Sequence, residues 1–101
     1  MSLISLTIRH GRTKEEAVRR LEAAVHEVST KLGFMVRRVD WAAERDRVKL
    51  EGIGFSLELW VDEQTVHVTG DVPLVGRLLG SPVASQVKAI VERTFQKGLP
   101  P

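Results

Sequence analysis

Three consecutive segments, 47–52, 55–61 and 66–72, alternate apolar and polar residues, and only a few residues separate each from the next. Strict alternation is typical of a strand that buries one face and exposes the other. Connections this short join antiparallel neighbours. Pro73 ends the last segment, because proline has no amide hydrogen to donate to a ladder. The chain is therefore expected to contain an antiparallel sheet that is apolar on one face.

Two further segments are expected to add strands to this sheet. Residues 3–10 alternate in the same way, with Leu and Ile on one face and Ser, Thr and Arg on the other. Residues 34–42 carry the apolar side chains of Met35, Val39 and Trp41 and lead into a polar turn. The sheet is then predicted to have five strands.

A long amphipathic helix is predicted between these two strands. Thr13 and Glu16 have the spacing of a capping box, in which the Thr13 hydroxyl accepts from an amide three residues later and Glu16 reaches back. Apolar residues then recur at helical spacing from Ala17 to Leu32. Gly33 stands where a helix often ends in a left-handed residue, so we expect that conformation there.

The segment after Pro73 is predicted to be helical as well. A short helical turn is expected over residues 74–79, followed by Ser81 as an N-cap and Pro82 in the first turn of a last helix. That helix has an apolar stripe that extends to Phe95.

The expected order is therefore β-α-β-β-β-β-α, in a single α+β domain over residues 1–101. Since every strand has one apolar face, both helices should cover the same face of one sheet, in a two-layer sandwich. The first strand is expected to pair with the last, which places the five strands in the order 1-5-4-3-2.

Composition removes several classes of function. The chain of 101 residues has a net charge of +2 and no cysteine, so disulfides, thiolate metal sites and cysteine nucleophiles are excluded. No run of apolar residues approaches the roughly 20 needed to span a membrane. The alternating N-terminus is unlike the continuous apolar core of a signal peptide. A cytoplasmic location is expected.

Catalytic and metal sites are not expected either. The only histidines are His10, His26 and His67, and no two of them have the spacing of a helical metal site. We expect surface or structural roles for them, with His10 bonding to the turn after it. The acidic residues suit helix ends and turns, and an open sheet face would not shield them for acid–base chemistry. The prediction is a protein that is not an enzyme and has no cofactor.

The most apolar stretch comes after the last strand and has two interpretations. It could cover one end of the core, or it could form a contact patch for a hydrophobic surface, a lipid-like ligand or a partner. The residues of this predicted patch are Val72, Leu74, Val75, Leu78, Leu79 and Val83.

The polar face of the sheet offers two more candidate surfaces. Trp60 falls in the outward register, and with Glu58 and His67 it marks a face that could join two copies in a homodimer. Basic residues also gather near the sheet, but exposed aromatics do not interleave with them as in an RNA-binding sheet, so nucleic acid is disfavoured as a partner. The members of this basic surface are Arg37, Arg38, Arg47 and Lys49.

The chain resembles a small bacterial family, the putative polyhydroxyalkanoic acid system proteins, over nearly its whole length. The resemblance comprises an early, a middle and a late group of residues, mostly glycines and apolar positions. They are Ile8-Arg9-His10 with Glu16-Ala17-x-x-Arg20-Leu21; Trp41, Asp46-Arg47-Val48-x-Leu50 and Gly52-x-Gly54-Phe55; and Val66-x-Val68-x-Gly70-Asp71-Val72-Pro73-Leu74.

The resemblance implies association with the polyhydroxyalkanoate storage system, and it carries no catalytic residues. The first functional hypothesis is an accessory protein that contacts the storage granule or a granule protein through the apolar segment 72–83. The layout is also similar to a shortened helix-grip domain, which gives the second hypothesis, a carrier of an acyl or other apolar ligand. A third hypothesis is an RNA-binding sheet.

Overall fold

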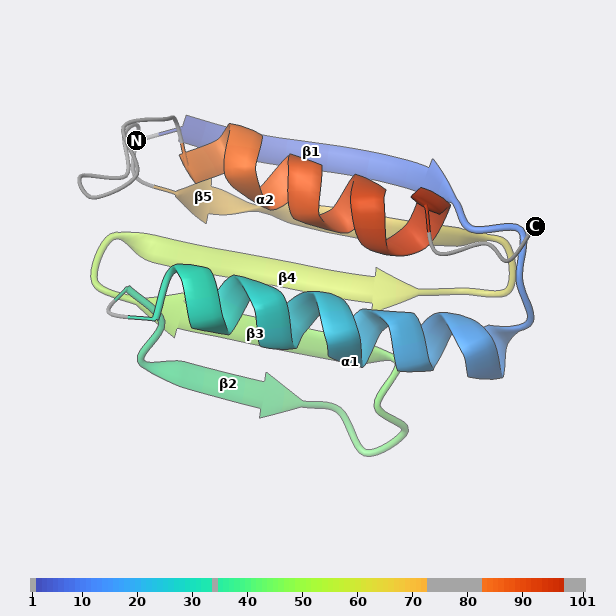
Figure 1. Ribbon diagram of the computed structural model, residues 1–101. Coiled ribbons are helices and arrows are strands. Elements are labelled where there is room, and N and C mark those ends of the chain that lie inside the picture. The colour runs from blue at the N-terminus through green and yellow to red at the C-terminus, as the bar shows by residue number, and fades with distance from the viewer. Residues whose placement is uncertain (1, 34, 73–82, 98–101) are drawn as a thin grey trace.

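The computed structural model describes residues 2–33, 35–72 and 83–97 and contains one sheet and two helices. Figure 1 shows the elements in chain order. They are β1 (Ser2–Arg9), α1 (Lys14–Lys31), β2 (Arg38–Trp41), β3 (Arg47–Gly52), β4 (Phe55–Val61), β5 (Thr65–Val72) and α2 (Val83–Glu92), which continues into a π-helical turn, Arg93–Lys97.

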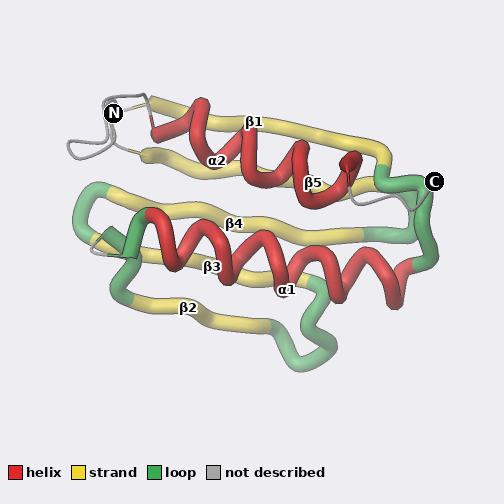
Figure 2. Tube along the Cα trace, viewed as in Figure 1, coloured by secondary structure: helices red, strands yellow, loops and turns green. Residues whose placement is uncertain are grey.

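The sheet has the predicted order β1-β5-β4-β3-β2, and every neighbouring pair is antiparallel. Strands β2 to β5 form a meander with short turns, whereas β1 reaches its place beside β5 from the opposite end of the chain. β1 and β2 are therefore the two edges of the sheet (Figure 2).

Both helices lie on the same face of the sheet, as the one-sided hydrophobic pattern predicted. α2 covers β1 and β5, whereas α1 lies along β4 and β3 (Figure 1). The core between the two layers is built from the inward residues of the strands, such as Leu57 and Leu59 on β4, and from the apolar stripes of the helices. The α+β sandwich predicted from the sequence is confirmed.

Local contacts explain where several elements begin and turn. The Thr13 hydroxyl accepts from the Glu16 amide at 3.2 Å and so caps α1 as predicted. The Glu16 carboxylate, however, bonds to Arg20 at 3.1 Å, one turn along the helix. Gly54 has φ +68° in the two-residue β3–β4 turn, a conformation that side chains rarely adopt.

The connection between α1 and β2 differs from the prediction. Gly33 is not in the left-handed region. The helix ends at Leu32 (φ −110°, ψ 26°), and the amides of Met35 and Val36 both bond to the Leu32 carbonyl. These bonds occupy the first residues of the predicted strand 34–42. Strand pairing is consequently confined to Arg38–Trp41.

The predicted helical turn at 74–79 and the predicted capping residues Ser81 and Pro82 lie outside the described residues.

Candidate functional site

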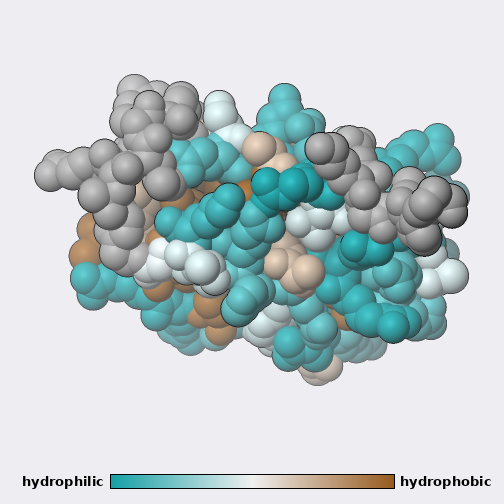
Figure 3. All heavy atoms as spheres, in the orientation of Figure 1, coloured by the Kyte–Doolittle hydropathy of each residue, from teal (hydrophilic) through white to brown (hydrophobic). Residues whose placement is uncertain are grey.

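The face of the sheet opposite the helices is not covered by any described element. Figure 3 shows the other side, where the helices present a mainly hydrophilic surface with scattered hydrophobic atoms. On the uncovered face, alternate strand residues point outward, and β4 contributes Ser56, Glu58 and Trp60 from the central position in the sheet. We call this surface the outer face.

A row of directly paired residues crosses the outer face near one end of the strands, from the first residue of β3 to Thr7 of β1. Arg47 on β3 pairs with Trp60 on β4, Trp60 pairs with His67 on β5, and His67 pairs with Thr7 on β1. The rings of Trp60 and His67 stack with their centroids 5.0 Å apart and their planes 14° apart. The Arg47 guanidinium lies 4.8 Å from the indole centroid. Since β3 and β5 flank β4 on opposite sides, the indole is held between a cation and an imidazole.

The imidazole of His67 is held in place by the turn between β4 and β5. His67 Nε2 lies 2.8 Å from the Thr65 hydroxyl and 3.2 Å from Asp62 Oδ2, and its Nδ1 lies 3.3 Å from the Thr7 hydroxyl. Asp62 also accepts from the backbone amides of Gln64 and Thr65. These amide bonds, with the Thr65 hydroxyl and His67, hold the pKa of Asp62 well below its ordinary value.

The predicted basic surface is largely balanced by acidic neighbours. Arg47 forms an ion pair with Glu58, Lys49 lies 3.3 Å from Glu51, and Arg38 lies 2.8 Å from Asp40. The fourth member, Arg37, is exposed just before β2, and its backbone amide bonds to the Glu51 carbonyl. Exposed pairs of this kind contribute little stability. Their effect is to leave the outer face close to electrically neutral.

The predicted dimer residues Trp60, Glu58 and His67 all lie on the outer face. Trp60 is stacked on His67, and Glu58 joins them through Arg47. The contact between Arg47 and Trp60 was not predicted from the sequence. The short hairpin between β3 and β4 contains that information, because it pairs Gly52 with Phe55 and therefore Arg47 with Trp60. That this face joins two copies of the chain stays a prediction.

The predicted apolar patch is divided between core residues and residues outside the described part of the chain. Val72 ends β5 and Val83 begins α2, and both are fully buried, because each faces the space between the sheet and the helices. These two members are therefore corrected to core residues. Leu74, Val75, Leu78 and Leu79 lie outside the described residues.

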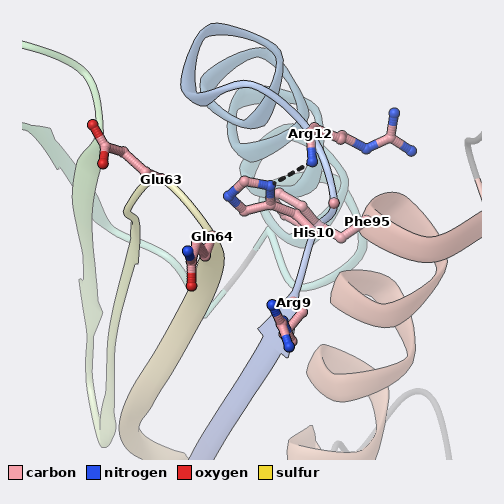
Figure 4. A pocket seen from close by; sticks show the side chains of 7 residues that line it. Arg9, His10, Arg12, Glu63, Gln64 and Phe95 are labelled. Carbon is pink, nitrogen blue, oxygen red and sulfur yellow. Dashed lines mark hydrogen bonds between the residues drawn. The ribbon is translucent and has the colours of Figure 1, made fainter.

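A cleft of about 330 Å³ opens at the end of β1 (Figure 4). Its central residue, His10, is 2% exposed; His10 Nδ1 accepts from the Arg12 amide at 3.0 Å, which confirms the predicted bond to the next turn. Nε2 lies 2.9 Å from the Asp62 carbonyl oxygen. His10 therefore ties β1 to the β4–β5 turn, and it has a structural explanation without a ligand.

Two properties of residues 2–33, 35–72 and 83–97 bear on other functions. These residues contain no group of three or more His, Cys, Asp or Glu side chains placed to hold a metal ion. None of the helices in the same ranges is long and apolar enough to cross a membrane.

Comparison with known proteins adds a family. The model of a family described as "Putative polyhydroxyalkanoic acid system protein" matches residues 4–99, so the chain belongs to this family. No curated protein and no solved structure matches it. The match extends from β1 beyond the π-helical turn and so includes both layers of the fold.

Proposed function

We propose that this member of the polyhydroxyalkanoic acid system family is a non-enzymatic accessory protein that binds a protein of the storage granule through its outer face. Membership of this family supports a role in the polyhydroxyalkanoic acid system. The observation that supports the surface is the stack of Trp60 between Arg47 and His67, near the end of the central strand on a face that no described helix covers. Tryptophan and arginine are the residue types that most often dominate binding energy at protein interfaces.

The order already present on the outer face favours binding. Trp60 is held on both sides before any partner arrives, so association costs less side-chain entropy than it would for a freely rotating indole. The ion pairs Arg47–Glu58 and Lys49–Glu51 balance the charge around it. A neutral, polar face with one aromatic centre suits another protein surface better than it suits an apolar polymer.

The apolar residues predicted from the sequence to form a patch provide a second contact in this proposal. Leu74 and Leu78 belong to the most hydrophobic stretch of the chain. A granule has both a polymer surface and bound proteins, so the two surfaces could act on the same particle. Variants of each surface can be compared in one assay.

The other hypotheses gain less support. A carrier needs room between the sheet and α2, whereas the inward residues there, such as Val68 and Val87, are fully buried against one another in a single core cluster. Base stacking by an RNA-binding sheet needs an open aromatic face, and both sides of the Trp60 ring are flanked by Arg47 and His67. An enzyme would need polar groups shielded from water, which an open sheet face does not provide.

Co-sedimentation with isolated polyhydroxyalkanoate granules tests the proposal. We expect wild type to associate with the granules. Trp60→Ala should bind at least about tenfold more weakly, as is typical when a dominant interface residue is truncated. His26→Ala, an exposed position on α1, is the matched control and should bind as wild type does. Circular dichroism establishes that each variant is folded.

Three outcomes would contradict the proposal or part of it. Wild type that stays in the supernatant would remove the granule function. Equal binding by a folded Trp60→Ala variant would remove the outer face. If only the Leu74→Asp/Leu78→Asp double variant lost binding, the contact would belong to the apolar segment. Granules stripped of protein by protease distinguish a protein partner from the polymer itself.

A further inference from the structure

The two edges of the sheet differ in how well they are protected against pairing with another strand. β2 is only four residues long, and it carries Arg38 and Asp40. β1 is eight residues long, and it carries no charged residue before Arg9. Natural proteins block exposed edges with short strands, charges, proline or bulges. Only the β2 edge has such a block, and in Figure 1 no described element lies beyond β1.

The hydrogen bonding of the sheet shows which backbone groups of β1 are open. In an antiparallel ladder, alternate residues exchange both bonds with the same neighbour. The His10 amide donates to the Gln64 carbonyl at 3.0 Å, in register with the β1–β5 ladder. The even-numbered residues of β1 are therefore the ones that bond to β5. Their odd-numbered neighbours direct N–H and C=O groups to the open edge; these are Leu3, Ser5, Thr7 and Arg9.

We propose that this edge pairs with the same edge of a second copy, with the two β1 strands antiparallel about a twofold axis at Leu6. The open residues 3, 5, 7 and 9 are symmetric about position 6. A ladder centred there pairs Ser5 with Thr7 and Leu3 with Arg9 of the other copy, so every open backbone group of β1 is bonded. This is strand addition, one of the standard ways in which proteins use an exposed sheet edge.

The side chains agree with this register. On the inner face, Leu6 would meet its own copy and Ile4 would meet Ile8, so each apolar residue gains an apolar neighbour. Leu6 is only partly buried within one chain, although it points toward the core. On the outer face, Leu3 is 83% exposed, and the aliphatic stem of Arg9 would cover it.

The helix above the edge is also compatible with a second copy. Arg93, just beyond α2, pairs with Glu27 of α1, so this side of the helix faces the middle of the sheet. The opposite side carries Ala84, Lys88 and Glu92 toward the open edge at helical spacing. In a twofold pair the two α2 helices run antiparallel, and Lys88 of each copy lies toward Glu92 of the other. These complementary charges and the small Ala84 favour a second copy over an unrelated strand.

A proline substitution can test the β1 edge without removing a hydrogen bond within the monomer. The Ser5 amide points away from β5, so Ser5→Pro removes a donor of the proposed interface but no bond of the monomer. We expect wild type at about twice the chain mass of 11.3 kDa by light scattering, and Ser5→Pro at the chain mass. Ser5→Ala keeps the amide and is the matched control. Trp60→Glu, on the outer face, should remain dimeric.

Cross-linking tests the register and does not depend on the proline variant being folded. The chain has no cysteine, so Ser5→Cys and Thr7→Cys each introduce a single thiol. Paired strand residues are close enough for a disulfide, whereas a residue two positions out of register is not. A mixture of the two variants should form mainly the mixed disulfide, which intact mass distinguishes from either homodimer.

Several results would overturn the proposal. Wild type that remains monomeric as its concentration rises would do so. So would a dimer that survives Ser5→Pro but is lost in Trp60→Glu, since the interface would then be the outer face. Absence of the mixed disulfide between two dimeric, folded variants would reject the register.

Discussion

The indole of Trp60 and the imidazole of His67 stack across neighbouring strands, 5.0 Å between centroids, on the face of the sheet that the helices leave open. The contact unites two residues that a hairpin turn places in register. It also fixes a large aromatic side chain where an unconstrained one would be mobile. The stack is therefore both a structural contact and the centre of the proposed binding surface.

The stack predicts measurable coupling between its two residues. In a double-mutant cycle of Trp60→Ala and His67→Ala, we expect the two losses of unfolding free energy to be non-additive by about 0.5–1.5 kcal/mol, the range for an aromatic pair. Urea unfolding of the four proteins measures this. A parallel cycle of Trp60→Ala with His26→Ala, far along the chain on α1, should show additivity. Additivity in both cycles would mean that the stack contributes no energy.

His10 is predicted to be important for stability. Its ring connects the Arg12 amide to the Asp62 carbonyl while it is 2% exposed. His10→Ala leaves both groups without this partner, and an unsatisfied buried polar group costs about 1–3 kcal/mol. Thermal unfolding should show the loss, whereas His26→Ala should unfold near wild type. A stable His10→Ala variant would indicate that water replaces the ring.

Gly70 is predicted to tolerate no side chain. A Cβ at this position of β5 would overlap the carbonyl oxygen of Ser56 and lie 2.9 Å from the Leu57 Cα, so backbone would have to move. We expect Gly70→Ala to lose about 1–3 kcal/mol of unfolding free energy, as for an overpacked site. Thr69→Ala, the neighbour on the outer face, serves as control and should lose less. Equal losses would contradict the steric explanation.

Asp62 is predicted to make stability depend on acid pH. Because its pKa is lower in the folded chain than its ordinary value of 3.8, the ionised carboxylate stabilises the fold above that value, and this contribution is lost as the pH falls below it. Asp62→Asn keeps an oxygen for the amides of Gln64 and Thr65 and does not titrate. Its urea midpoint should therefore fall less than that of wild type between about pH 5 and about pH 2. Parallel curves would exclude Asp62 as a source of acid sensitivity.

Much of the fold could be predicted because each element has a local cause. Alternation defined β3, β4 and β5, short turns required antiparallel pairing, and Thr13 marked the start of α1. The predicted left-handed conformation of Gly33 was wrong, because the backbone conformation beyond α1 depends on where β2 lies in the sheet. There the amides of Met35 and Val36 bond back to Leu32, which no local pattern indicates.

The candidate surfaces were less predictable, because exposure is a property of the whole fold. Hydrophobicity left Val72 and Val83 with two interpretations, a cover on the core or a contact patch, and both are core residues. Basic residues such as Arg47 and Lys49 suggested a charged surface, but neighbours on the strands balance them. A sequence shows that a side chain is apolar or charged, not which side chain lies beside it.

By itself the sequence determined the elements, the one-sided apolar pattern and the antiparallel meander of β2 to β5, since these depend on periodicity and turn length along the chain. Only the tertiary structure decided that Arg47, Trp60, His67 and Thr7 form one row, and that β1 presents a long, uncharged edge while β2 is short and charged. Both depend on which strands become neighbours across space. Contacts between residues distant in the chain are set by packing of the two layers, not by local sequence.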